Sequence, residues 1–354
     1  MPDKLSSIFE EAIAKQIFSG GQVWLESNSQ VLAHCSFGTT AYDAPYSHTV
    51  TNQTLYDVAS LTKLFTTTAL LIALRQAEFS IETPLAEFFP EFATHDKRSI
   101  TLRDLLQHNS GIDLAIQSLI AISPDEWITH IAQAPLHSEP KTKVLYSCTN
   151  FFLLARVIEL ICKQPLDDYI TTQILQPLQM QRTAWLPRSH FTLEEIAPTE
   201  RDEEHLWHGV VHDEAARTWQ EFTGHASCGN SGLFSTAEDL AKFAAMWCHN
   251  GTYQSMQILT REEVESIFDN PARELNPIAR RGLGWQLNAT FFMSEKAPAD
   301  AAGHTGFTGP TLWLSRSTGH ICIILNNRVY PTRDTLSRFP YHRRIARWLI
   351  NQAI

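Results

Sequence analysis

Residues 57–65 read Asp-Val-Ala-Ser-Leu-Thr-Lys-Leu-Phe and lead into an apolar, helix-favouring run that ends near Arg75. If a helix begins at Ser60, the Lys63 amine lies on the same face, about one turn away. A buried, neutral amine can take a proton from serine, and a helix N-terminus supplies backbone N–H groups at that point. The stretch therefore predicts a nucleophile beside a base. The alternative interpretation is that Ser60 only caps the helix and has no catalytic role.

The same Ser-x-x-Lys spacing recurs at Ser138 and Lys141, where Pro140 argues against a helix. We treat this second copy as an internal false positive. The spacing alone is weak evidence, so other parts of the chain have to support it.

The composition is that of an ordinary globular protein. The 28 Lys and Arg residues against 38 Asp and Glu residues give a net charge of −10 over 354 residues. Because no domain-sized basic excess is present, we expect no nucleic-acid partner. Arginines between residues 333 and 347 are interspersed with apolar side chains, which favours a solvated helix face over a membrane-binding surface.

The N-terminal residues 1–15 carry Asp3, Glu10 and Glu11 and no long apolar core, so they resemble neither a signal peptide nor a membrane anchor. The six cysteines are scattered singly, without CxxC pairs, and are expected to be reduced thiols. We therefore predict a cytoplasmic protein.

Apolar periodicity predicts strands at both ends of the chain and helices between them. The expected strands are 22–26, 30–35, 283–292, 311–315 and 320–326, and the expected helices beyond the Ser60 helix are 5–18, 101–107, 124–134, 149–163, 166–175, 237–250, 260–268 and 334–350. This order predicts an α/β (α+β) fold, an antiparallel sheet flanked by helices with an inserted all-helical domain. We place the sheet domain at residues 1–78 and 215–354, the helical domain at 79–214, and the active site in the cleft between them.

Two further stretches carry polar residues in unusual contexts. Tyr146 lies in a turn before an apolar helix, where its phenol either points into a site or is a buried group with one hydrogen bond. Residues 303–309 read Gly-His-Thr-Gly-Phe-Thr-Gly, and glycines at this density let the backbone approach a ligand or another strand closely.

Three histidines within ten residues, His205, His208 and His212, raise the question of a metal site. His208 and His212 have the spacing of zinc ligands on a helix, but Gly209 weakens the helix and no His-Glu-x-x-His order supplies a base. We expect a polar loop at a cleft and no metal. A nucleophile elbow at Ser227 is rejected because the Gly-x-Ser-x-Gly spacing fails.

In this order, Ser60-x-x-Lys63, the turn at Tyr146 and the segment 304–306 resemble the motifs of the serine β-lactamase and penicillin-binding protein superfamily. More closely, the chain resembles the branch that holds class C β-lactamases, D-aminopeptidases, DD-peptidases and serine esterases. The other similar segments are 100–112, 177–180, 197–200, 210–214, 232–240 and 303–309, so the resemblance spans roughly residues 5–350.

The resemblance implies a β-lactamase-like fold and a catalytic set. Ser60 would be the acylated nucleophile and Lys63 its neutralised partner. Tyr146 would be the second proton-transfer group, and His304 the fourth member of the set. An acyl-enzyme would form and then hydrolyse, and no cofactor is implied.

The resemblance also implies how the substrate is held. The backbone N–H groups of Ser60 and Phe307 would form the oxyanion hole, with Gly306 allowing the strand to approach. Thr305, Gly306 and His212 would be substrate-binding residues.

Two residues depart from the pattern of that branch. Cys148 stands where Asn or Asp is common, and a thiol orients a substrate amide poorly, although Asn150 one turn on could substitute. His304 stands where many members carry Lys, so a permanent cation becomes a group that titrates near neutrality. Both changes favour esters over β-lactams or peptides.

We therefore predict a serine hydrolase that cleaves carboxylic esters, with a small-molecule ester or acyl substrate as its partner. Weak activity on β-lactams or D-amino-acid amides is compatible with the same residues. The alternatives are a DD-peptidase or β-lactamase proper, a non-catalytic penicillin-binding-like protein that only binds its ligand, and a metal hydrolase.

Overall fold

The computed structural model describes residues 3–43, 45–202, 204–268 and 280–352. Its strands are β1 (Gly20–Ser27), β2 (Gln30–Gly38), β3 (Tyr56–Asp57), β4 (Glu200–Arg201), β5 (Leu206–Trp207), β6 (Phe234–Ser235), β7 (Thr252–Tyr253), β8 (Met256–Gln257), β9 (Gln286–Leu287), β10 (Ala302–Thr305), β11 (Thr311–Ser315) and β12 (His320–Asn326). Its α-helices are α1 (Asp3–Ala14), α2 (Thr62–Gln76), α3 (Leu102–Leu106), α4 (Ile116–Ile120), α5 (Trp127–Gln133), α6 (Cys148–Cys162), α7 (Leu166–Ile170), α8 (Glu214–Thr223), α9 (Ala237–Cys248), α10 (Arg261–Ser266), α11 (Thr290–Met293) and α12 (Phe339–Gln352).

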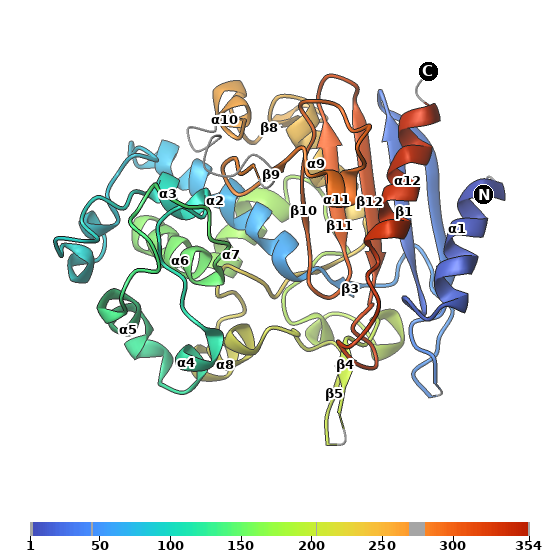
Figure 1. The fold of residues 1–354 in the computed structure, drawn as a ribbon, viewed down its shortest axis with the longest axis horizontal. Helices are drawn as coiled ribbons and strands as arrows, with labels where there is room; N and C mark the ends of the chain where they lie inside the picture. The colour runs from blue at the N-terminus through green and yellow to red at the C-terminus, as the bar shows by residue number, and fades with distance from the viewer. Residues whose placement is uncertain (1–2, 44, 203, 269–279, 353–354) are drawn as a thin grey trace.

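The two ends of the chain build the main sheet. Six strands pair in the antiparallel order β2-β1-β12-β11-β10-β9, with β1 against β12 joining the N-terminal hairpin to the C-terminal strands. α1 and α12 lie side by side against one face of this sheet, and α9 packs on the other (Figure 1). The sheet is therefore covered on both faces.

Alternate residues of β12 belong to two separate cores. Ile321, Ile323 and Leu325 lie in the larger core with α9 and the other helices, whereas Cys322 and Ile324 lie in the smaller core with α1 and α12. Successive side chains of a strand point to opposite faces, so a strand covered on both sides is apolar throughout. This explains the uninterrupted apolar run of β12.

The helix α2 lies inside the molecule. Its residues 62–74 are all buried, and it packs against α6. An apolar helix with no polar face suits a central position. Because the turn that carries Ser60 leads into α2, this packing holds the Ser-x-x-Lys motif between the sheet and the remaining helices (Figure 1).

The predicted fold class is confirmed by this arrangement. The prediction of a strand over 283–292 is wrong in most of its length, because only β9 pairs in the sheet and α11 packs its apolar side chains into the smaller core instead. The part of the chain expected to be helical also contains the two-residue strands β4 and β5. The domain boundaries at 78/79 and 214/215 stay a prediction. Within the described ranges, no helix is long and apolar enough to cross a membrane.

Candidate active site

Ser60 lies on a 3-10 turn, Ala59–Leu61, and the α-helix begins only at Thr62. Ala59 has a φ of 46°, in the left-handed region that non-glycine residues rarely adopt. Asp57 holds this turn, since its Oδ1 accepts a hydrogen bond from the Ala59 N–H at 2.8 Å. Burial raises the pKa of Asp57 to about 6. Backbone strain of this kind concentrates at functional sites.

Lys63 is fully buried, and three acceptors surround its Nζ. The Nζ donates to Ser60 Oγ at 3.0 Å and to the Asn230 backbone oxygen at 3.0 Å, and it lies 3.5 Å from Cys148 Sγ. Burial acts to lower the pKa of Lys63, but nearby acidic groups, Cys148 foremost, outweigh it and leave that pKa above its ordinary value. Three acceptors also match the three donors of an ammonium group. The resting Lys63 is therefore charged, which differs from the neutral amine that we expected.

Tyr146 extends from the loop before α6 to the same serine. Its hydroxyl donates to Ser60 Oγ at 2.9 Å, and the side chain is 42% exposed. Its ring lies 4.6 Å from that of His108, and 5.2 and 5.1 Å from Lys63 Nζ and Arg281 Cζ. The alternative of a buried structural tyrosine is wrong, because the phenol is open to solvent at the site.

The loop after β10 is held against residues 57–58, just before the Ser60 turn. A Cβ on Gly306 would lie 2.6 Å from the carbonyl oxygen of residue 58, so only glycine allows this approach. Thr308 Oγ1 donates to the carbonyl oxygen of residue 57 at 2.7 Å. The Phe307 backbone is thereby kept close to the turn on which the oxyanion hole is predicted.

His304 does not titrate near neutrality, contrary to our expectation. Burial, with Arg281 and Lys63 nearby, lowers its pKa well below 6.5. Its Nδ1 lies 2.9 Å from the Thr305 carbonyl oxygen, which can only accept, so Nδ1 carries the proton. Its Nε2 is then an acceptor and faces Arg281 Nη1 at 3.4 Å. His304 is neutral, and the permanent cation beside it is Arg281.

Cys148 and Asn150 lie in the first turn of α6 but have different surroundings. Cys148 contacts Lys63 and lines a cavity of about 20 Å³ whose walls are mainly apolar. Asn150 is fully buried, accepts from Ser110 Oγ at 2.9 Å and donates to the Leu105 carbonyl oxygen at 3.3 Å. The prediction that Asn150 contacts substrate is therefore wrong, because both ends of its amide are bonded inside the helical part.

Thr305 and His212 lie next to this arrangement. Thr305 ends β10 with a half-buried side chain. The His212 backbone N–H donates to Asp57 Oδ2 at 2.8 Å, and the His212 ring lies 5.4 Å from that of Phe307. His212 Nε2 lies 2.7 Å from Glu200 Oε2. The contact of Thr305 and His212 with substrate stays a prediction.

The zinc alternative gains no support from the histidine-rich loop. His208 Nε2 lies 2.7 Å from a backbone carbonyl oxygen, His205 lies beside Asp202 on the surface, and His212 is bound by Glu200. Within the part of the chain that the structure describes, no three His, Cys, Asp or Glu side chains gather as metal ligands.

The sequence did not reveal three residues of the site, Asn230, His108 and Arg281. Asn230 contributes a carbonyl oxygen, which any residue could supply. His108 is buried, and its Nδ1 accepts from the Ser147 N–H at 3.1 Å. The one signal for Arg281 was an arginine pair at the start of the glycine-containing stretch 280–285.

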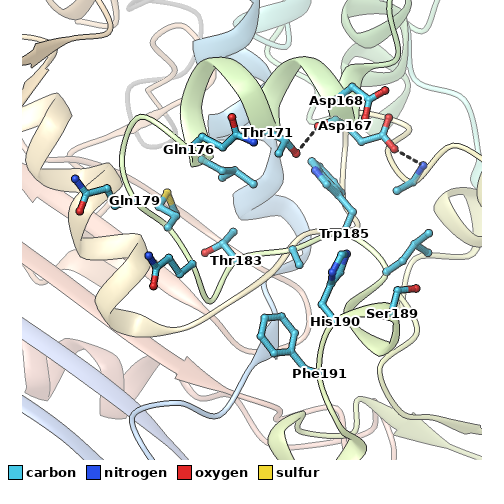
Figure 2. A pocket seen from close by; sticks show the side chains of 16 residues that line it. Asp167, Asp168, Thr171, Gln176, Gln179, Thr183, Trp185, Ser189, His190 and Phe191 are labelled. Atoms are coloured by element: carbon cyan, nitrogen blue, oxygen red, sulfur yellow. Dashed lines mark hydrogen bonds between the residues drawn. The ribbon is translucent and has the colours of Figure 1, made fainter.

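A large cavity lies elsewhere, beside α7 and the π-helical turn Thr171–Leu175 that follows it. It has a volume of about 770 Å³, and Figure 2 shows Trp185, His190 and Phe191 among its lining residues. In the same view, Asp167 Oδ2 accepts a hydrogen bond from the Ala226 N–H. None of the groups that contact Ser60 Oγ lines this cavity, so we assign it no part in the chemistry.

The family model described as Beta-lactamase matches residues 5–347. The chain belongs to the Beta-lactamase family. It is 29% identical over 309 residues to an Escherichia coli K12 protein provisionally named a D-alanyl-D-alanine carboxypeptidase. The matched region covers 78% of this chain and 69% of that relative. It is 30% identical over 313 residues to a protein of the same provisional name from Salmonella gallinarum. That match covers 78% of this chain and 70% of the relative.

Two solved structures share the fold of this chain. A penicillin-binding protein homologue from Caulobacter crescentus superposes with a TM-score of 0.77 at 17% identity, covering 100% of this chain and 98% of its own. EstCE1, described as a hydrolase with promiscuous acyltransferase activity, superposes with a TM-score of 0.76 at 17% identity and 97% coverage of each chain. The resemblance to the serine β-lactamase and penicillin-binding protein superfamily is confirmed, and the protein is a serine hydrolase of that type.

Proposed function

We propose that this Beta-lactamase family protein is a carboxylesterase that works through an acyl-enzyme on Ser60. The observation that supports it is the contact of one serine oxygen with two polar groups, Lys63 at 3.0 Å and Tyr146 at 2.9 Å. Serine becomes a good nucleophile only when a partner takes its proton. Here one partner supplies the proton acceptor and the other a fixed positive charge.

The positive charge on Lys63 decides which of these two groups accepts the proton of Ser60. Because Lys63 is an ammonium group, the proton acceptor is Tyr146: its hydroxyl first gives its proton to solvent, and the phenolate then takes the Ser60 proton while Oγ bonds to the carbonyl carbon of the ester. Tyr146 then gives that proton to the leaving oxygen as the C–O bond breaks, which leaves the acyl group on Ser60. Water, deprotonated in the same way, attacks the acyl carbon and releases the acid and free Ser60.

The oxyanion hole of this proposal consists of the backbone N–H groups of Ser60 and Phe307. The close approach of Gly306 to residue 58 supports it, because this contact keeps the Phe307 backbone near the serine turn. Donors of this kind each contribute about 10²–10³ to the rate in related chemistry.

Two features favour esters over amides. Cys148 offers a weak donor where a carboxamide would orient a substrate amide. Asn150 cannot replace it, because Ser110 and Leu105 bind both ends of its side chain. The second candidate is a D-alanyl-D-alanine carboxypeptidase, which the provisional name of the Escherichia coli relative favours.

The test combines turnover with labelling. The wild-type protein should hydrolyse a short-chain nitrophenyl ester and acquire one fluorophosphonate adduct, located on Ser60 by mass spectrometry. Ser60→Ala should lose both, whereas Ser138→Ala, in the second Ser-x-x-Lys copy, should keep both. If the wild-type protein is neither active nor labelled, the esterase proposal is wrong, and the result favours a non-catalytic protein that only binds its ligand.

A further inference from the structure

Arg338 is a buried arginine that directly precedes α12. Its carbonyl oxygen accepts hydrogen bonds from the N–H groups of Tyr341 at 3.1 Å and His342 at 3.2 Å, so the first turn of the helix fixes its position. The residue is 5% exposed, and among the described residues its side chain forms no ion pair. Burial lowers the pKa of Arg338 to about 9, which leaves it charged at neutral pH. A buried cation without an anion is costly for the fold.

The carbonyl oxygen of Gly306 is the acceptor that Arg338 contacts. The Nη2 of Arg338 donates to this oxygen at 2.6 Å, in a buried environment. The Gly309 N–H donates to the same oxygen at 3.3 Å and closes the turn 306–309. Hydrogen bonds from a charged donor are about twice as strong as neutral ones. The buried charge is therefore directed at one particular peptide group.

That peptide group carries one of the two N–H groups of the oxyanion hole in the proposed function. The Gly306 carbonyl and the Phe307 N–H belong to the same trans peptide unit, so they point in opposite directions. The Phe307 N–H forms no hydrogen bond with another described residue. It is therefore free to bind a substrate oxygen on the side of the peptide away from Arg338.

A cation at the carbonyl side strengthens the N–H as a donor. It draws electron density towards the Gly306 oxygen, and hydrogen bonds that share a peptide group polarise one another in this way. The charge is in place before the reaction begins, as effective oxyanion stabilisation requires. The cost of burying Arg338 is then offset when negative charge develops at the Phe307 N–H.

We propose that Arg338 is a positioning residue that orients and polarises the Gly306–Phe307 peptide group, and so makes the Phe307 N–H a stronger oxyanion donor. This inference rests on the proposed function, in which that N–H stabilises the oxyanion formed from the ester carbonyl. Arg338 acts through the peptide group and does not contact the substrate.

Arg328 provides a matched control in the same turn. Its Nε donates to the Phe307 carbonyl oxygen at 3.1 Å, and its Nη1 donates to Thr335 Oγ1 at 2.9 Å. The Phe307 carbonyl shares its peptide unit with the Thr308 N–H, which has no part in the proposed oxyanion hole. Arg328 therefore anchors the turn without contacting the peptide group that carries the donor.

The kinetic test compares the same substitution at the two arginines. Arg338→Met keeps the length of the side chain and removes a buried, unpaired charge, and the Gly306 oxygen keeps its bond from Gly309, so we expect the variant to fold. Its kcat/KM for a nitrophenyl ester should fall by about tenfold or more, somewhat less than the 10²–10³ expected for complete loss of a donor. Arg338→Lys should recover part of the loss, and Arg328→Met should keep the wild-type value.

A trifluoromethyl ketone tests the oxyanion hole itself. Ser60 Oγ adds to its carbonyl carbon, the serine proton passes to the Tyr146 phenolate, and the ketone oxygen becomes an alkoxide held like the oxyanion of the reaction. The inhibition constant should rise in Arg338→Met by the same factor as kcat/KM falls, because such an adduct resembles the transition state. It should stay at the wild-type value in Arg328→Met.

Gly306-Phe307 is the only Gly-Phe pair in the sequence, which gives a readout independent of turnover. Protein labelled with carbon-13 at the glycine carbonyls and nitrogen-15 at the phenylalanines should show a single carbonyl–amide correlation by NMR. In Arg338→Met the Gly306 carbonyl carbon and the Phe307 amide proton should both move to lower chemical shift. In Arg328→Met the Gly306 carbonyl signal should stay in place.

The two kinds of readout separate this inference from the proposed function. If the wild type neither hydrolyses esters nor is labelled on Ser60, the esterase proposal is wrong and the NMR correlation decides alone: signals that move in Arg338→Met support the polarised peptide, and unchanged signals overturn it. In an active protein, equal losses of kcat/KM in Arg338→Met and Arg328→Met overturn the inference, because Arg338 would then only anchor the turn. Wild-type kcat/KM in Arg338→Met also overturns it. If Arg338→Met does not fold, Arg338→Gln takes its place with the same expected results.

Discussion

The Nζ of the fully buried Lys63 lies 3.0 Å from the Oγ of Ser60, whose side chain is half-buried. Lys63→Met keeps the length and apolar stem of the side chain and removes its charge. We expect kcat/KM for a nitrophenyl ester to fall by about 10²–10³, the usual effect of losing a preorganised charge at the reacting oxygen. Lys141→Met, at the lysine of the second Ser-x-x-Lys copy, should have wild-type activity. Equal activities in the two variants would remove Lys63 from the mechanism.

Tyr146→Phe removes the hydroxyl that lies 2.9 Å from Ser60 Oγ and keeps the ring that packs on His108. Steady-state kinetics should show kcat lowered by about 10²–10⁴, as for the loss of a general acid or base. The control is Tyr330→Phe, because the Tyr330 hydroxyl binds Asp43, whose carboxylate has no contact with Ser60. An unchanged rate in Tyr146→Phe would contradict the proposed proton transfer.

Cys148→Asn restores a carboxamide next to Lys63. We expect the ratio of amide to ester hydrolysis to rise by about tenfold, the value of one added neutral hydrogen bond in the transition state. The measurement compares a nitrophenyl ester with a nitroanilide of the same acyl group. Cys148→Ala removes the thiol without adding an amide, so its ratio should stay at the wild-type value. The same rise in both variants would show that the carboxamide is irrelevant.

Gly306→Ala tests the approach of the β10 loop to the serine turn. The added Cβ would lie 2.6 Å from the Val58 carbonyl oxygen, so the loop has to move. Stability should fall by about 1–3 kcal/mol and ester hydrolysis should fall with it. Gly224→Ala meets no atom within 4 Å but has a φ of 72°, so it should cost stability without affecting kcat. Full activity in Gly306→Ala would argue against an oxyanion hole at Phe307.

Three buried histidines should make the fold acid-sensitive. Burial lowers the pKa values of His108, His304 and His342 well below 6.5. The unfolded chain therefore binds more protons below pH 6.5, and stability falls as the pH falls from there. Each histidine can contribute up to about 1.4 kcal/mol per pH unit. Urea unfolding at pH 7.5 and 5.5 should show this loss.

The contribution of a single histidine can be isolated with His342→Gln. Its side chain contacts Thr311 and Asn326, away from Ser60. The loss of stability between pH 7.5 and 5.5 should be smaller in this variant than in wild type, even if the variant is less stable at both values. An identical pH dependence would show that His342 is not held neutral by the fold.

The order of elements and the family motifs could be predicted from the sequence, because both are local patterns. Apolar runs identified β11 and β12 at their observed bounds, and the Ser60–Lys63 spacing marked the start of α2. The segment 283–292 was predicted wrongly because its apolar residues suit a strand and a buried helical turn equally, and only contacts with α12 decide between them.

The sequence by itself singled out Ser60, Lys63, Tyr146 and the 304–306 segment as candidates for the chemistry, because they follow one another in the order of the family motifs. Only the tertiary structure decided their charge states and neighbours. Lys63 is an ammonium group because the Asn230 carbonyl and Cys148, distant in sequence, surround its Nζ. His304 is neutral because burial and neighbouring cations disfavour its protonation, and the edge pairing of β9 brings in Arg281. Ionisation depends on desolvation and on charges close in space, and sequence spacing records neither.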